Sequence, residues 1–163
     1  MIFSSSPFFE NSIAKLPYPA QMLHKERSLS AIKSFLSESI PHGSTVGVIF
    51  PKEILTAILP GIARERQLTI VPIGASTELL LKLEKEGVLA LGPTSHVDVF
   101  ITEPDGLVPG GALVKPHETT VLSQIPAIGV GSSLQKTKEN PATHDFVPLS
   151  GMITEHGSAL KKR

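Results

Sequence analysis

The chain has 163 residues, of which 15 are basic and 15 are acidic, and it contains no cysteine. A neutral chain without a basic run does not predict binding to nucleic acid or to an anionic membrane surface. The absence of cysteine excludes disulfides, a thiolate nucleophile and cysteine-ligated zinc, so any site must be built from other side chains.

Residues 1–21 are predicted to form an N-terminal arm. Three prolines interrupt this segment, and it shows no helical period. It has neither the basic start nor the apolar run of a signal peptide or membrane helix, so a cytoplasmic location is expected. Its apolar residues cannot be buried locally, which predicts an interface and a homodimer: Phe3, Phe8, Phe9, Ile13 and Leu16.

Residues 22–163 are predicted to form a single α/β domain that begins with a helix over 22–40. Apolar residues recur at helical spacing from Leu29 to Ile40, and a Pro-His-Gly sequence then ends the helix. A short apolar run at 45–50 follows, which is typical of a buried parallel strand.

The middle of the chain alternates between predicted strands and helices. A helix follows the first strand, and Pro60 is expected to kink or split it. Further strands are expected at 68–73, 88–91, 97–102 and 127–130, and further helices at 76–86 and 119–123. Pro72 places the end of the second strand near an edge or a bend. This alternation predicts a three-layer, Rossmann-like α/β fold, with a mostly parallel sheet and helices on both faces.

Two acidic residues, Glu103 and Asp105, directly follow the predicted strand at 97–102. Ligands of open α/β sheets bind beyond the carboxyl ends of the strands, so both are candidate catalytic residues. Asp105 is a candidate general acid or base, or a ligand for a sugar hydroxyl, and Glu103 is its possible partner in sharing a proton. The alternative is structural, because Pro-Asp-Gly is an ordinary β-turn sequence and Glu103 is then a solvated acid.

Binding residues are predicted around the same edge of the sheet. Lys52 and Lys115 are candidate cations for a phosphate or carboxylate, and Gly110 and Gly111 allow close approach of a ligand. Ser76 is either an anion ligand or a helix N-cap. The histidines lack the spacing of a metal site, and no metal or cofactor is expected. Four segments are predicted to wall the pocket: 50–52, 74–76, 103–106 and 110–115.

Three segments resemble one protein family, and they occur in the family's order. Residues 97–105 read VDVFITEPD and are similar to the family's Val-Asp-x-Val-Ile-Val-Gly-Ala-Asp, and a family-like Gly-Gly and Lys follow. The tail is similar to the family's Asn-Pro-Ala, Pro and Ile-Ile-Thr-Glu-x-Gly, at 140–142, 147–148 and 152–157. Residues 41–46, PHGSTV, resemble the start of the family's first strand.

This family comprises the regulatory subunits of eukaryotic initiation factor 2B and the methylthioribose-1-phosphate and ribose-1,5-bisphosphate isomerases. The resemblance covers about residues 25–157 and implies the family's C-terminal Rossmann-like domain, which pairs as a dimer. It implies that Asp105 is the catalytic aspartate and that Thr154 and Glu155 close the site. Ribose-5-phosphate isomerase and the lactate-utilisation domain, in the wider superfamily, remain alternatives.

The chain departs from the isomerase pattern at the site itself. The isomerases have a cysteine after the first strand, where this chain reads Phe50-Pro51-Lys52, and the Gly-Ala before the aspartate has become Glu103-Pro104. A phosphate loop is also absent. We therefore expect a non-catalytic domain like an initiation factor 2B subunit, acting by protein association, with a vestigial small-anion pocket. The alternative is an aldose–ketose isomerase for a phosphorylated sugar, using Asp105.

Overall fold

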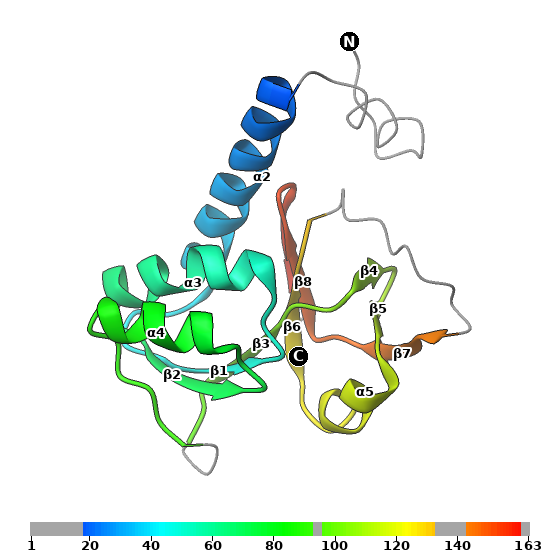
Figure 1. Ribbon diagram of the computed structural model, residues 1–163. Coiled ribbons are helices and arrows are strands. Elements are labelled where there is room, and N and C mark those ends of the chain that lie inside the picture. Colours follow the sequence, from blue (N-terminus) through cyan, green and yellow to red (C-terminus); the bar gives the residue numbers. More distant parts are fainter. Residues whose placement is uncertain (1–17, 93–95, 133–142, 161–163) are drawn as a thin grey trace.

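The computed structural model in Figure 1 describes residues 18–92, 96–132 and 143–160, and the side chains of 25–92, 96–132 and 143–159. The predicted arm up to residue 17 and the Asn-Pro-Ala sequence at 140–142 lie outside the described residues. Helix α2 spans Tyr18–Ser39, so it begins earlier than the predicted helix at 22–40 and takes up the end of the predicted arm.

A six-stranded sheet with the order β2-β1-β3-β6-β8-β9 forms the centre of the molecule. Its strands are β1 (Thr45–Ile49), β2 (Thr69–Ile73), β3 (Val99–Thr102), β6 (Ala127–Val130), β8 (Gly151–Thr154) and β9 (Gly157–Leu160). The first five run parallel, and β9 alone pairs antiparallel with its neighbour. The predicted mostly parallel sheet is therefore confirmed.

The sheet is the middle of three layers (Figure 1). One face is covered by α2, α3 (Glu53–Glu65) and α4 (Thr77–Lys85). The other is covered by the short helix α5 (Pro116–Leu122) and a three-stranded antiparallel sheet of β4 (Gly106–Val108), β5 (Gly111–Val114) and β7 (Asp145–Pro148). The predicted three-layer α/β fold is confirmed. None of the described helices is long and apolar enough to span a membrane.

The two faces of the sheet build two separate cores, as the period of two along a strand requires. On β1, Val48 packs into the core beneath α2, α3 and α4, and Ile49 packs into the core beneath the small sheet and α5. Gly47 also faces the second core, where a Cβ would overlap the ring of Phe100. The strands are thus buried on both sides, and their carboxyl ends reach one common edge.

The small sheet was not expected from the sequence, which predicted helices on both faces. Strands β4 and β5 form a hairpin within residues 106–114, a stretch that overlaps two of the predicted pocket walls, 103–106 and 110–115. Strands of three and four residues, each beginning with glycine, are too short to show a readable alternation of apolar and polar side chains.

Two prolines illustrate how far local sequence predicts structure. Helix α3 is continuous through Pro60, so the predicted split is wrong. The lost hydrogen bond is offset by an apolar face that α3 buries, which comprises Ile54, Leu55, Ile58, Leu59 and Ile62. Pro72 lies in β2, the outermost strand on its side of the sheet, as predicted. Beyond β2, the expected strand at 88–91 forms only a single bridge, between Ile70 and Ala90.

One buried polar group in β3 lacks a partner and provides a test of the packing. Thr102 is fully buried, and its Oγ1 has no hydrogen-bond partner among the residues that the structure describes. Replacing Thr102 by valine keeps the shape and removes the unpaired hydroxyl, so we expect the free energy of unfolding to rise by about 1 kcal/mol, measured by urea denaturation. The reverse change at the buried Val130 of β6 should lower it. A clear loss of stability in Thr102→Val would contradict this prediction.

Candidate functional site

The candidate site lies where β1 and β3 end. Because these two strands are parallel neighbours, the loop from β1 to α3 and the loop from β3 to β4 meet at one edge of the sheet. The first loop supplies Lys52, and the second supplies Glu103 and Asp105. Glu118 of α5 and His144, which directly precedes β7, come to the same place from later in the chain.

Glu103 is bound to the N-terminus of α3. Its Oε1 accepts hydrogen bonds from the backbone N–H groups of Lys52 (3.0 Å) and Leu55 (2.8 Å), and its Oε2 accepts one from Ile54 (3.1 Å). Burial raises the pKa of the Glu103 carboxyl, although these three donors and the charge of Lys52 oppose the rise. Only 1% of Glu103 is exposed, so neither oxygen is available to a substrate.

The local sequence explains why α3 needs this carboxylate. Its N-cap position is Lys52, which makes no side-chain capping bond, and none of the usual capping residues precedes the helix. The chain enters the helix through Phe50, whose φ of 48° is unusual for a bulky residue and whose ring lies against Gly74. The first N–H groups of α3 are therefore satisfied by a residue that is distant in the sequence.

The Lys52 ammonium lies between three acidic residues. Its Nζ donates to the backbone oxygen of Glu103 at 2.6 Å, and it lies 3.5 Å from Asp105 Oδ1 and 3.7 Å from Glu118 Oε1. The lysine side chain is 29% exposed. Lys52 therefore neutralises Asp105 of the β3–β4 loop and Glu118 of α5, while its own backbone N–H donates to the Glu103 carboxylate.

Asp105 is paired on its second oxygen with a buried histidine. Oδ2 lies 3.0 Å from Nε2 of His144, whose side chain is 1% exposed, and Nδ1 of the same ring lies 3.1 Å from Oγ1 of Thr143. One tautomer satisfies both contacts, with Nε2–H donating to Asp105 and the Thr143 hydroxyl donating to Nδ1. Burial opposes ionisation, but the bond to His144 and the charges of Lys52 and Lys115 outweigh it and lower the pKa of Asp105.

Glu118 and His144 belong to the cluster, and the sequence analysis missed both. Glu118 lies in the first turn of the short helix α5 and its side chain is 5% exposed, yet its Oε1 has no hydrogen-bond partner in the described part of the chain. Its Oε2 lies 3.7 Å from His117, whose ring meets Phe50 edge-on at 6.2 Å between centroids. Both residues are distant from Lys52 in the sequence, so no local spacing pattern connects them to the cluster. Their approach could not be foreseen because the small sheet was not predicted.

The remaining predicted residues have structural contacts of their own. Ser76 caps α4, since its Oγ accepts from the Leu79 N–H at 3.2 Å. Thr154 Oγ1 accepts from His156 N–H at 3.1 Å, and Glu155 Oε2 accepts from Ser132 Oγ at 2.7 Å. Gly110 and Gly111 close the hairpin between β4 and β5, where the first has a φ of 81° and the second has no room for a Cβ. Lys115 is exposed and acts on Asp105 through its charge.

A cleft of about 450 Å³ opens beside this cluster, between the starts of α3 and α4. It is lined by Pro51, Lys52, Glu53, Thr56, Ala57, Ser76, Glu78 and Lys82. The cleft shares residues 51–52 and 76 with the predicted pocket, whereas 103–106 and 110–115 do not line it. Among the described residues, no group of three or more His, Asp or Glu side chains could hold a metal ion.

No protein-family model and no curated protein matches the chain. Solved structures do. The crystal structure of eIF2B beta from Chaetomium thermophilum matches with a TM-score of 0.68 and 19% identity, over 87% of this chain and 56% of that chain. The Pyrococcus horikoshii translation initiation factor eIF-2B matches with a TM-score of 0.67 and 13% identity, over 85% and 66%. The chain has the fold of an eIF2B subunit.

The likeness to eIF2B subunits confirms the fold inferred from the sequence motifs. The delta subunit of eIF-2B from A. fulgidus agrees, with a TM-score of 0.67 and 13% identity over 86% of this chain and 61% of that chain. The chain thus spans about 56–66% of the length of these eIF2B structures. At such identities the likeness establishes the fold, and the activity has to be argued from the cluster around Lys52.

Removing the Glu103 carboxylate should destabilise the protein strongly. Glu103→Ala leaves the buried N–H groups of Lys52, Ile54 and Leu55 without an acceptor, so we expect the free energy of unfolding to fall by about 3 kcal/mol in urea denaturation. Glu53→Ala is the matched control, because this acid lies in the same helical turn but is exposed. Its loss should stay below about 1 kcal/mol. Equal effects of the two substitutions would contradict a capping role for Glu103.

The contribution of Asp105 should depend on pH. Its pKa is lowered in the folded state, so its ionised form stabilises the protein above the ordinary aspartate pKa of about 3.9, and this stabilisation is lost as the pH falls through the lowered value. Asp105→Asn should cost about 1 kcal/mol near neutral pH, a modest amount because the group is partly solvated. Denaturation at several pH values should show the difference from wild type shrinking in acid. A constant difference would contradict the prediction.

Proposed function

We propose that this chain is a non-catalytic domain with the eIF2B-subunit fold that acts by associating with protein, first with a second copy of itself. One observation supports this most directly: the carboxylate of Glu103 is bound by three backbone N–H groups and is 1% exposed. A general base must reach the proton it abstracts. Glu103 is instead a structural ligand of α3.

The second candidate acid is also engaged. Asp105 has an ammonium at 3.5 Å on one oxygen and a buried histidine at 3.0 Å on the other, and both favour a permanently ionised aspartate. A general acid or base works best when its pKa lies near the working pH, and the pKa of Asp105 is shifted in the opposite direction. This arrangement suits a structural ion-pair network better than proton transfer.

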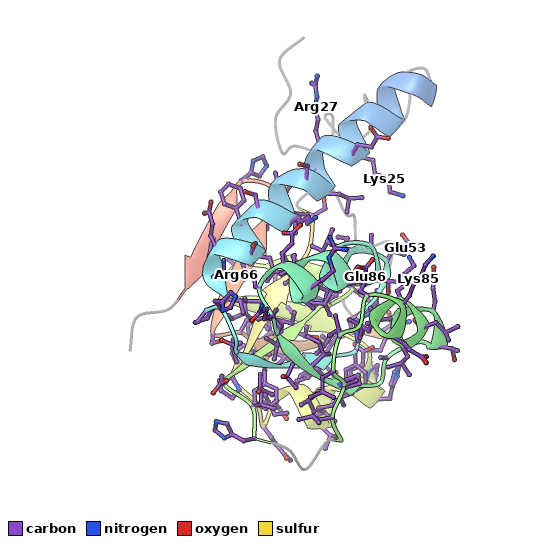
Figure 2. The ribbon with its side chains drawn as sticks, turned by 90° about the vertical axis from the view of Figure 1, so that its left-hand side faces the viewer. Lys25, Arg27, Glu53, Arg66, Lys85 and Glu86 are labelled. Carbon is purple, nitrogen blue, oxygen red and sulfur yellow. The ribbon has the colours of Figure 1, made fainter. Side chains whose placement is uncertain are left out.

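Association is favoured by the neighbours and by α2. One solved neighbour is the tetrameric eIF2B-beta2-delta2 complex from C. thermophilum, with a TM-score of 0.67 and 18% identity. In this chain, the N-terminal part of α2 projects beyond the sheet and the other helices (Figure 1), and Lys25 and Arg27 point outward from it (Figure 2). Among the described side chains of α2, which start at residue 25, the first that packs against the core is Leu29. We propose that this projecting part contributes to a homodimer, together with the arm that precedes it.

A second candidate function is an aldose–ketose isomerase for a phosphorylated sugar. It is favoured by the partial exposure of Asp105, whose side chain is 16% accessible, and by the position of Lys52 and Lys115 beside it. In this alternative, Asp105 moves the proton and a lysine holds the phosphate.

The cytoplasmic location that was expected from the sequence also stays a prediction.

The association proposal predicts that the purified chain sediments with twice the chain mass at micromolar concentration. Lys25→Glu with Arg27→Glu reverses two exposed charges on α2 and should weaken the dimer at least tenfold, measured by analytical ultracentrifugation across a dilution series. Lys82→Glu with Lys85→Glu reverses two exposed charges on α4, is the charge-matched control and should leave the dimer unchanged (Lys85 is labelled in Figure 2). A monomer at high micromolar concentration would contradict the dimer.

The same preparation distinguishes the two candidate functions. Methylthioribose 1-phosphate and ribose 1,5-bisphosphate are incubated with the chain and followed by NMR for the ketose product. The proposal predicts no turnover above a blank. Turnover that disappears in Asp105→Asn would favour the isomerase instead.

A further inference from the structure

The two edges of the main sheet differ in how far they are covered. Strand β2 forms one edge and contains Pro72, and the segment after α4 pairs with it through the bridge between Ile70 and Ala90. The N–H of Ile70 donates to the Leu89 oxygen at 2.9 Å, and its carbonyl accepts from the Leu91 N–H at 2.8 Å. A proline and a covering segment both prevent the addition of a further strand. This edge is therefore closed over part of its length.

Strand β9 forms the opposite edge, and none of the described residues pairs with its outer side. All four of its residues pair with β8 on the inner side, and an antiparallel strand that is paired on one side directs its remaining N–H and C=O groups outward. Ser158 and Ala159 are exposed, and β9 reads GSAL, without a proline or a charged residue. Natural edge strands usually carry such residues because they prevent pairing. This edge is therefore open to a further strand.

Helix α2 lies against β8 and β9, beside the open edge. The Oγ of Ser39, the last residue of α2, donates to the Oγ of Ser158 at 3.1 Å. In Figure 1 the hairpin of β8 and β9 stands beside the lower part of α2, on the side away from α4. A partner that extends the sheet at β9 therefore also approaches α2, whose projecting part the association proposal assigns to the dimer.

A second copy of the chain offers the groups that this edge lacks. A two-fold axis perpendicular to the sheet places β9 of one copy antiparallel to β9 of the other, so the same outward N–H and C=O groups pair in both directions. The rotation keeps the helical layers on the same side of the sheet, which makes the two α2 helices neighbours. This matters because a specific interface buries about 1,200–2,000 Å² in total, more than a pair of short strands supplies.

Charge favours the antiparallel arrangement of two copies. The sequence after β9 is Lys161-Lys162-Arg163, and the turn before β9 contains Glu155. In an antiparallel pair the end of one strand adjoins the start of the other, so the basic sequence of each copy comes near the acidic turn of its partner. A parallel arrangement would instead bring the two basic sequences together, and like charges placed opposite each other are destabilising.

We propose that β9 is the strand through which two copies of this chain pair, antiparallel about a two-fold axis, to form one continuous sheet with the two α2 helices side by side. The inference rests on the proposed function, because it names the surface through which the proposed association occurs. Backbone pairing at β9 fixes the register of the two copies, and α2 supplies further contact area.

The test measures distances between two copies. The chain contains no cysteine, so one introduced cysteine carries a single nitroxide label: Ala159→Cys in exposed β9, or Lys85→Cys at the exposed end of α4. Neighbouring strands are about 4.8 Å apart, so in pulsed electron paramagnetic resonance the two labels at 159 should lie less than about 30 Å apart. Strand β2 lies five strand spacings from β9, so the two labels at 85 should lie more than about 40 Å apart.

Sedimentation and circular dichroism of each labelled variant verify the dimer and the fold. His156→Cys, in the exposed turn before β9, repeats the measurement with the same expected distance should the label at 159 dissociate the dimer. A dimer whose labels at 159 and 156 lie more than about 40 Å apart would overturn the inference and leave the association proposal standing. Short distances at 85 would also overturn it, because they would place the contact near β2.

The same measurements separate this failure from failure of the proposed function. A wild-type chain that sediments as a monomer, with no dipolar coupling between labels at any position, would overturn both proposals. A dimer in which β9 is covered by another part of its own chain, such as the arm or residues 133–142, would show long distances at 159. That result would overturn only the pairing of the two β9 strands.

Discussion

The bond between the Glu103 carboxylate and the N-terminus of α3 is the constraint on which the candidate site depends. It joins the end of β3 to the first turn of a helix that follows β1, so it fixes the relation between a strand and a helix that do not adjoin in sequence. Because side chains alternate along a strand, a shift of β3 by one residue would turn this carboxylate away from its donors. The positions of Lys52 and Asp105 follow from the same arrangement.

The fold was largely predictable because β1, β2, β3 and β6 of the main sheet are short, continuous apolar runs, although β8 and β9 were not predicted. The run at 45–50 and the run at 97–102 correspond to β1 and β3, and both are buried on two faces as parallel strands require. The small sheet was not predictable, because β4 and β5 are short and glycine-containing, and because β7 pairs with β5 from more than thirty positions away.

The site was predictable in position but not in chemistry. Strand-end reasoning located Lys52, Glu103 and Asp105 at one edge of the sheet, because it depends only on the parallel order of the strands. It did not show that the Glu103 carboxylate accepts hydrogen bonds from the N-terminus of α3. That role arises because α3 has no capping side chain at its own N-cap position, Lys52. His144 was missed because its approach to Asp105 requires the unpredicted small sheet.

Lys52 has a consequence for how this protein tolerates sequence change. Its ammonium contacts Glu103 and Asp105 of the β3–β4 loop and Glu118 of α5. Lys52 forms no other ion pair among the described residues. Effects of substitutions that share a partner are not additive. Loss of Lys52 would leave two carboxylates close together without their cation, and loss of either carboxylate would make the lysine easier to replace. In related chains these three positions should therefore change together rather than one at a time.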